Sequence, residues 1–181
     1  MSARQAPARV YALAAALGWW GIILALIPYA RDVIDLLRAR SLLMLAVTAA
    51  FAVLFLGLIG LAAWLRRAGA LSGRQVLVGT ALLALGVAAA QLFERPEDRW
   101  HAIEYGVLGV LFWAATTTRG LPRVLFAAVA TGGCGWLDEA VQFLVPSRVY
   151  DPWDVGLNAG AGLASVGIAE IVARCGDEGD R

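Results

Sequence analysis

The sequence contains no lysine, a single histidine and only two cysteines. All 15 basic residues are arginines, and against 14 acidic residues they leave a formal net charge of +1. The chain therefore lacks the excess of positive charge with which proteins bind nucleic acid, and we expect no nucleic-acid partner. Cys134 and Cys175 have neither a CxxC spacing nor another metal-binding spacing, so we also expect no disulfide, no metal and no cofactor.

Apolar residues, in contrast, make up 60% of the sequence and charged residues only 16%. A soluble domain of 181 residues cannot bury that much apolar surface, which indicates an integral membrane protein in contact with the lipid bilayer. The predicted fold class is all-α, a polytopic membrane helix bundle with about six transmembrane helices. Each apolar stretch approaches the roughly 20 residues that cross a bilayer, and the stretches are 9–29, 42–65, 75–92, 101–117, 122–145 and 155–173.

Three short motifs predict helix ends. The segment 72–75, SGRQ, has the pattern of a capping box that opens the third helix. Gly120 and Pro122 are typical of a C-cap followed by the first turn of a new helix. The segment 151–154, DPWD, predicts an aspartate N-cap, a proline at the first helical position and a second carboxylate at the third.

The arginines predict the orientation of the helices, because cytoplasmic loops are enriched in basic residues. One set of loops and ends holds nine, namely Arg4, Arg9, Arg66, Arg67, Arg74, Arg119, Arg123, Arg174 and Arg181. The other holds six, namely Arg31, Arg38, Arg40, Arg95, Arg99 and Arg148. We therefore expect cytoplasmic N- and C-termini in a bacterial cytoplasmic membrane. The first stretch is too long for a cleaved signal peptide and is expected to remain as a signal-anchor.

Polar residues interrupt the fourth stretch on one helix face. His101, Glu104, Tyr105 and Leu108 are spaced i, i+3, i+4 and i+7, which places them on the same side of a helix. These residues lie near the predicted outer end of the helix, and we expect their side chains to face other helices.

Two adjacent acids, Asp138 and Glu139, interrupt the fifth stretch. An acid at the centre of a membrane helix costs roughly 2.5–3.5 kcal/mol, so an intramembrane acid is a candidate functional residue. Adjacent helical residues point about 100° apart, so we do not expect the two acids to share a partner readily. We expect Glu139, the strongest single candidate, to face a polar cluster with Gln142. We expect Asp138 to face a neighbouring helix or a polar group nearer the interface.

The sixth stretch and the loop before it add further polar groups at the same level. Asn158 lies one turn inside the sixth helix, and Arg148 lies in the preceding loop. The segments 131–135, TGGCG, and 156–164, GLNAGAGLA, contain small residues at close helical spacing, with Gly156 and Gly160 in a GxxxG pattern, and they predict close contact between the fifth and sixth helices. We expect Asp154 to act first as a helix cap, and the polar groups of the last three helices to meet near the outer rim of the bilayer.

These residues form three ordered motifs that resemble those of the VanZ-like family of small bacterial membrane proteins, over about residues 75–173. The motifs read His101-x-x-Glu104-Tyr105-Gly106-x-x-Gly109, Asp138-Glu139-x-x-Gln142-x-x-x-Pro146-x-Arg148 and Asp154-x-x-x-Asn158-x-x-Ala161-Gly162. The resemblance implies an added N-terminal transmembrane hairpin at 1–70, a VanZ-like core at 71–175 and a short polar tail at 176–181.

The resemblance also implies a function, because the founding member of the family is associated with low-level resistance to the glycopeptide teicoplanin. The motif residues that would carry over are His101, Glu104, Tyr105, Glu139, Gln142, Pro146, Arg148, Asp154 and Asn158. Two departures are visible. Family members often have lysine or another basic residue shortly before the histidine, where this chain has Arg99, and the loop after the third stretch is short.

Three kinds of function remain open at this point. A binding protein would hold a lipid-linked envelope precursor or a lipophilic glycopeptide, with Arg148 pairing to a phosphate or carboxylate. An intramembrane hydrolase or transferase would use His101, Glu104 and Glu139 as acid, base or metal ligands. A proton-coupled transporter would titrate Glu139, although no inverted repeat is evident. We favour the binding protein and leave open whether any reaction is catalysed.

Overall fold

The computed structural model describes residues 5–145 and 150–177, and every regular element in these two ranges is an α-helix. The six helices are α1 (Gln5–Ala39), α2 (Leu43–Arg67), α3 (Gly73–Ala90), α4 (Pro96–Ala115), α5 (Leu121–Gln142) and α6 (Pro152–Asp177). The predicted all-α class is confirmed, and each predicted apolar stretch falls on one of these helices.

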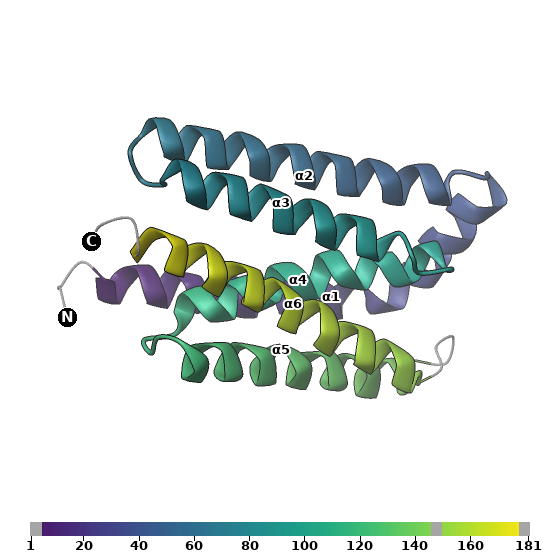
Figure 1. Ribbon diagram of the computed structural model, residues 1–181. Helices are drawn as coiled ribbons and strands as arrows, with labels where there is room; N and C mark the ends of the chain where they lie inside the picture. Colours follow the sequence, from purple (N-terminus) through teal and green to yellow (C-terminus); the bar gives the residue numbers. More distant parts are fainter. Residues whose placement is uncertain (1–4, 146–149, 178–181) are drawn as a thin grey trace.

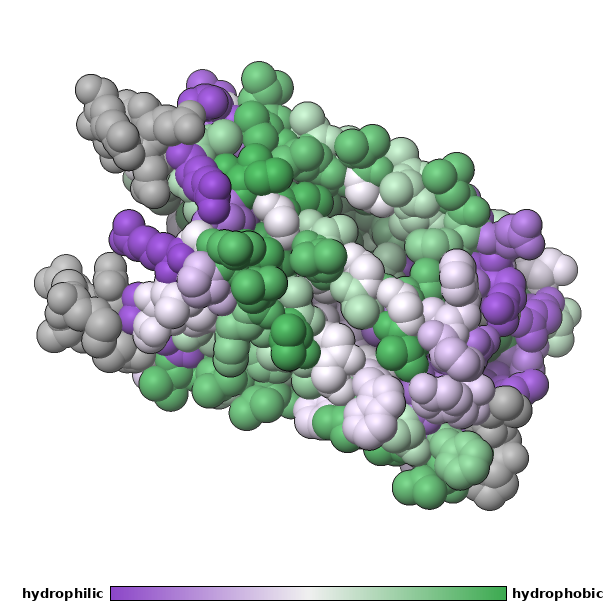
Figure 2. Space-filling view, turned by 60° about the horizontal axis from the view of Figure 1, so that its bottom comes forward, coloured by the Kyte–Doolittle hydropathy of each residue, from purple (hydrophilic) through white to green (hydrophobic). Residues whose placement is uncertain are grey.

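Five of the helices have the length and composition of membrane spans, which is the pattern of a multi-pass membrane protein. The surface agrees, because a hydrophobic band separates two hydrophilic ends of the molecule in Figure 2. The exception is α4, which carries Asp98, Arg99 and Glu104 in its first half. A sixth crossing by α4 and cytoplasmic termini therefore stay predictions.

The least apolar helix lies at the centre of the bundle. In Figure 1, α4 runs through the middle, and it contacts α1, α2, α5 and α6. Its residues Tyr105, Leu108 and Phe112 are buried together with residues of α1, α5 and α6. A helix with charged residues is costly to expose to lipid, and the surrounding helices cover it.

The first two helices diverge rather than pack along each other. α1 lies mainly against α4, whereas α2 lies against α3 and α4. The start of α1 and the end of α6 lie at the same end of the bundle, together with the α2–α3 and α4–α5 connections (Figure 1). The division into an added hairpin and a core is still a prediction, but α1 packs directly on that core.

Two of the three predicted helix ends are confirmed. The Ser72 hydroxyl accepts a hydrogen bond from the Gln75 backbone N–H at 3.2 Å, and the Gln75 side chain accepts one from the Ser72 N–H at 2.9 Å. The Asp151 carboxylate accepts a hydrogen bond from the Trp153 N–H at 2.9 Å at the start of α6. The prediction for Gly120 is wrong in part, because α4 already ends at Ala115 and Gly120 is the N-cap of α5, with a φ of +65°.

The first helix is longer than predicted. Residues 30–39, expected in an outer loop, continue α1 as a helix of 35 residues, which corresponds to about 52 Å. Asp35 supports this extension, because it pairs with Arg31 at 4.0 Å and with Arg38 at 3.0 Å along the same helix. The helix therefore extends past the roughly 30 Å hydrocarbon core.

The predicted contact between α5 and α6 is confirmed, but it uses other small residues than the GxxxG pattern. A Cβ atom on Gly162 would lie 2.5 Å from Thr131, and one on Gly135 would lie 2.6 Å from Asn158. Gly156 and Gly160 have no such neighbour among the described residues, so the GxxxG pair is not part of the contact, whereas Thr131, Gly135 and Gly162 lie in the two segments from which the contact was predicted. Gly156 and Gly160 lie on another face of α6.

Gly162→Ala should destabilise the protein by about 1–3 kcal/mol, because the added methyl group overlaps Thr131 and forces α5 and α6 apart. Thermal unfolding in mild detergent measures this change. Gly160→Ala is the matched control, since it adds the same methyl group two residues earlier without a close neighbour. Equal melting temperatures for the two variants would contradict the packing described here.

Candidate functional site

A cavity of about 580 Å³ lies between the C-terminal half of α1 and the first turns of α4 and α6. This volume is within the range of small-molecule binding pockets. One wall is apolar and consists of α1 and α2 residues, among them Ile23, Ile27, Ile34, Leu43 and Val47. The opposite wall is polar and consists of residues from α4, α5 and α6, among them His101, Glu104, Asp138, Gln142 and Asp154.

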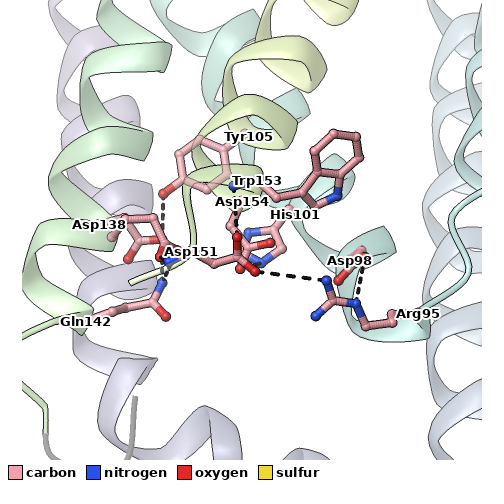
Figure 3. Close-up of polar contacts among 10 residues, drawn as sticks. Arg95, Asp98, His101, Tyr105, Asp138, Gln142, Asp151, Trp153 and Asp154 are labelled. Carbon is pink, nitrogen blue, oxygen red and sulfur yellow. Dashed lines mark hydrogen bonds and ion pairs between the residues drawn. The ribbon is translucent and has the colours of Figure 1, made fainter. Parts of the chain in front are cut away.

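A buried hydrogen-bond network joins α4 to α5 on the polar wall. The Tyr105 hydroxyl donates to Asp138 Oδ2 at 2.8 Å. The Gln142 amide donates to Glu139 Oε1 at 2.7 Å and lies 3.4 Å from Asp138 Oδ2. Figure 3 shows Tyr105 and Gln142 converging on Asp138. Gln142 lies one turn further along α5 and reaches both acids, so the expectation that they would not readily share a partner is wrong. Asp138 also faces a neighbouring helix, as expected, because it accepts a hydrogen bond from Tyr105 on α4.

Glu139 has a different position from Asp138. Its side chain is fully buried, and its Oε2 accepts a hydrogen bond from the Asp151 backbone N–H at 3.1 Å, at the start of α6. It is not among the residues that line the cavity, whereas Asp138 is. Glu139 therefore holds α5 against the start of α6, and Asp138 presents the acid to the cavity.

A second pair joins α4 to α6. His101 Nε2 lies 3.8 Å from Asp154 Oδ2, and both side chains line the cavity. The His101 ring also stacks on the Tyr105 ring with centroids 6.4 Å apart. His101 thus contacts both Tyr105 and Asp154, and the three side chains lie close together in Figure 3.

Charged residues surround the end of the cavity where α1 ends and α4 begins, and the sequence did not single them out as site residues. We call them the charged rim, which consists of Arg31, Asp35, Arg38, Arg95, Asp98 and Asp151. Arg95 lies 3.5 Å from Asp98 and 3.9 Å from Asp151 (Figure 3). The spacing of Arg31, Asp35 and Arg38 at i, i+4 and i+7 was the available signal, but it identifies a site only if α1 continues as a helix.

Arg99, the arginine shortly before His101, is not among the residues that line this cavity. Its guanidinium donates to the Phe93 carbonyl oxygen at 2.9 Å and to the Gln91 side chain at 2.8 Å. Arg99 therefore stabilises the turn between α3 and α4.

The remaining predicted site residues are placed as follows. Glu104 lines the cavity. Asn158 is fully buried against Gly135, outside the cavity lining, and among the described residues its side-chain amide has no hydrogen-bond partner. Arg148 and Pro146 lie outside the described residues. Nowhere in residues 5–145 and 150–177 do three His, Cys, Asp or Glu side chains come together as a metal site.

No family model, no curated protein and no solved structure matches the chain. The resemblance to the VanZ-like family therefore depends on the three motifs alone.

Tyr105→Phe should lower the free energy of unfolding by about 1–3 kcal/mol, because it leaves the buried Asp138 without its hydroxyl donor. Thermal unfolding in detergent measures the loss. Tyr11→Phe on the exposed surface of α1 is the control and should have no effect. A Tyr105→Phe variant as stable as the control would show that the hydrogen bond contributes nothing.

Proposed function

We propose that this cavity binds the polar end of an amphiphilic, lipid-linked molecule of the cell envelope. The observation that supports the proposal best is the two-sided lining, apolar on α1 and α2 and polar on α4, α5 and α6. An amphiphile matches both walls, because its chain can lie on the isoleucine and leucine side chains while its head group meets Asp138, His101 and Asp154.

The polar wall is held in place by contacts behind it. The Glu139 contact with the Asp151 backbone fixes α5 against α6, and the Tyr105 hydroxyl fixes Asp138 against α4. Side chains held in this way lose little freedom when a ligand binds. The family resemblance favours an envelope ligand or glycopeptide tolerance as the biological setting.

One observation supports an alternative, an intramembrane hydrolase or transferase acting on a lipid-linked substrate. His101 and Asp154 both line the cavity, with the Asp154 carboxylate 3.8 Å from His101 Nε2, so two groups of the kind used in general acid–base catalysis lie together at this wall. The enzyme would use the same cavity and the same class of ligand. Turnover of a bound amphiphile that stops in His101→Ala would favour this alternative.

Ala46→Phe should reduce the amount of amphiphile that copurifies with the protein several-fold, because Ala46 lines the cavity and phenylalanine would occupy it. Organic extraction of the purified protein and mass spectrometry measure the bound molecules. Ala49→Phe is the matched control, since it adds the same ring on the exposed side of the same helix. Equal amounts in both variants would contradict binding in this cavity.

Deletion of the gene should change the envelope lipid profile or the sensitivity to teicoplanin, and the wild-type chain should restore it. Asp138→Asn, His101→Ala and Arg148→Ala should fail to restore it at normal protein level, whereas Asp32→Asn on the exposed part of α1 should succeed. Full restoration by Asp138→Asn and His101→Ala would contradict a role for the polar wall.

A further inference from the structure

The α1 side of the charged rim alternates in sign along one helix face. Arg31, Asp35 and Arg38 all line the cavity, and the Asp35 carboxylate lies 4.0 Å from the Arg31 guanidinium and 3.0 Å from that of Arg38. About half of each of these side chains is exposed. Ion pairs this exposed contribute little to stability, so a ligand can exchange for them at small cost.

The opposite side of the rim repeats the alternation with residues from α4 and the start of α6. Arg95 lies between the carboxylates of Asp98 and Asp151, at 3.5 Å and 3.9 Å. Figure 3 shows Arg95 pointing toward Asp151. The described rim therefore has three guanidinium groups and three carboxylates, and neither sign prevails.

Below the rim, most of the titratable side chains of the polar wall are those of acidic residues. Glu104, Asp138 and Asp154 line the cavity there, with His101 beside Asp154. All the arginines that line the described cavity belong to the rim. Among the residues that the structure describes, guanidinium groups thus line the cavity only at the rim, while carboxyl groups line it both at the rim and below it.

We infer that the cavity takes a zwitterionic phospholipid whose head group carries a phosphodiester and a primary ammonium. This inference rests on the proposed binding of an amphiphile and names its class. A ligand that is only anionic would approach the carboxylates, and one that is only cationic would approach the guanidinium groups. The zwitterion satisfies both, with its phosphate on the arginines and its ammonium on the carboxyl groups.

The ammonium group must be able to donate hydrogen bonds. A primary ammonium has three donors for carboxylate oxygens, whereas a trimethylammonium has none. The apolar wall of α1 and α2 accepts the lipid chains, so a soluble head group without chains would lack half of the contacts. The inference therefore commits to a membrane lipid as the ligand.

The test reconstitutes the full chain into nanodiscs with equal amounts of phosphatidylethanolamine, phosphatidylcholine and phosphatidylglycerol that carry identical acyl chains. Native mass spectrometry after release from the disc counts the lipids retained. We expect phosphatidylethanolamine to be retained about tenfold over phosphatidylglycerol, because charge-assisted hydrogen bonds are worth about one power of ten in affinity. Phosphatidylcholine should also be retained less than phosphatidylethanolamine.

Two rim variants test separately how the ammonium and the phosphate of the lipid head group contribute to binding. Asp35→Asn should reduce the preference for phosphatidylethanolamine over phosphatidylglycerol, because it removes a carboxylate that meets the ammonium. Arg38→Gln should reduce retention of both lipids, because it removes a phosphate contact. The matched controls are Asp32→Asn and Arg40→Gln, which alter exposed residues outside the cavity lining and should behave as wild type.

Retention of phosphatidylglycerol at or above phosphatidylethanolamine, or equal retention of all three lipids, would overturn this inference and leave the proposed amphiphile binding intact. Rim variants that match their controls would also overturn it. Retention of every lipid at no more than the level of the Ala46→Phe variant would instead show that the proposed function itself is wrong.

Discussion

The whole structure depends on keeping the polar residues of α4 away from lipid. This helix carries Glu104, His101 and Tyr105 among apolar neighbours, and exposing such groups to hydrocarbon is costly. The other helices surround α4, and α1, α5 and α6 are in direct contact with it. The central place of α4 then brings its polar face against the acids of α5 and the start of α6.

Hydrogen bonds between helices stabilise these buried polar groups. Asp138 on α5 accepts from Tyr105 on α4, and Glu139 accepts from the backbone at the start of α6. Each acid therefore connects α5 to another helix, Asp138 to α4 and Glu139 to the start of α6. Close backbone packing at Gly135 and Gly162 makes such short distances possible, since any larger side chain would separate α5 from α6.

The cavity follows from the direction of α1. Its N-terminal half packs on α4, where Trp19 donates a hydrogen bond to the Glu104 backbone oxygen at 2.9 Å. Its C-terminal half instead faces the polar wall across the cavity and ends in the charged residues of the rim. The helix α1 thus supplies both apolar residues and part of the charged rim to the same cavity.

The helices and the candidate acids could be predicted from local sequence patterns. Long apolar stretches, the Ser72 capping box and the Asp151 cap are local properties, so composition and spacing sufficed to predict them. Local patterns could not predict that Asp138 rather than Glu139 lines the cavity, or that Arg31, Asp35 and Arg38 belong to the site. These outcomes depend on the rotation of each helix and on the length of α1, which are decided by packing between residues far apart in the chain.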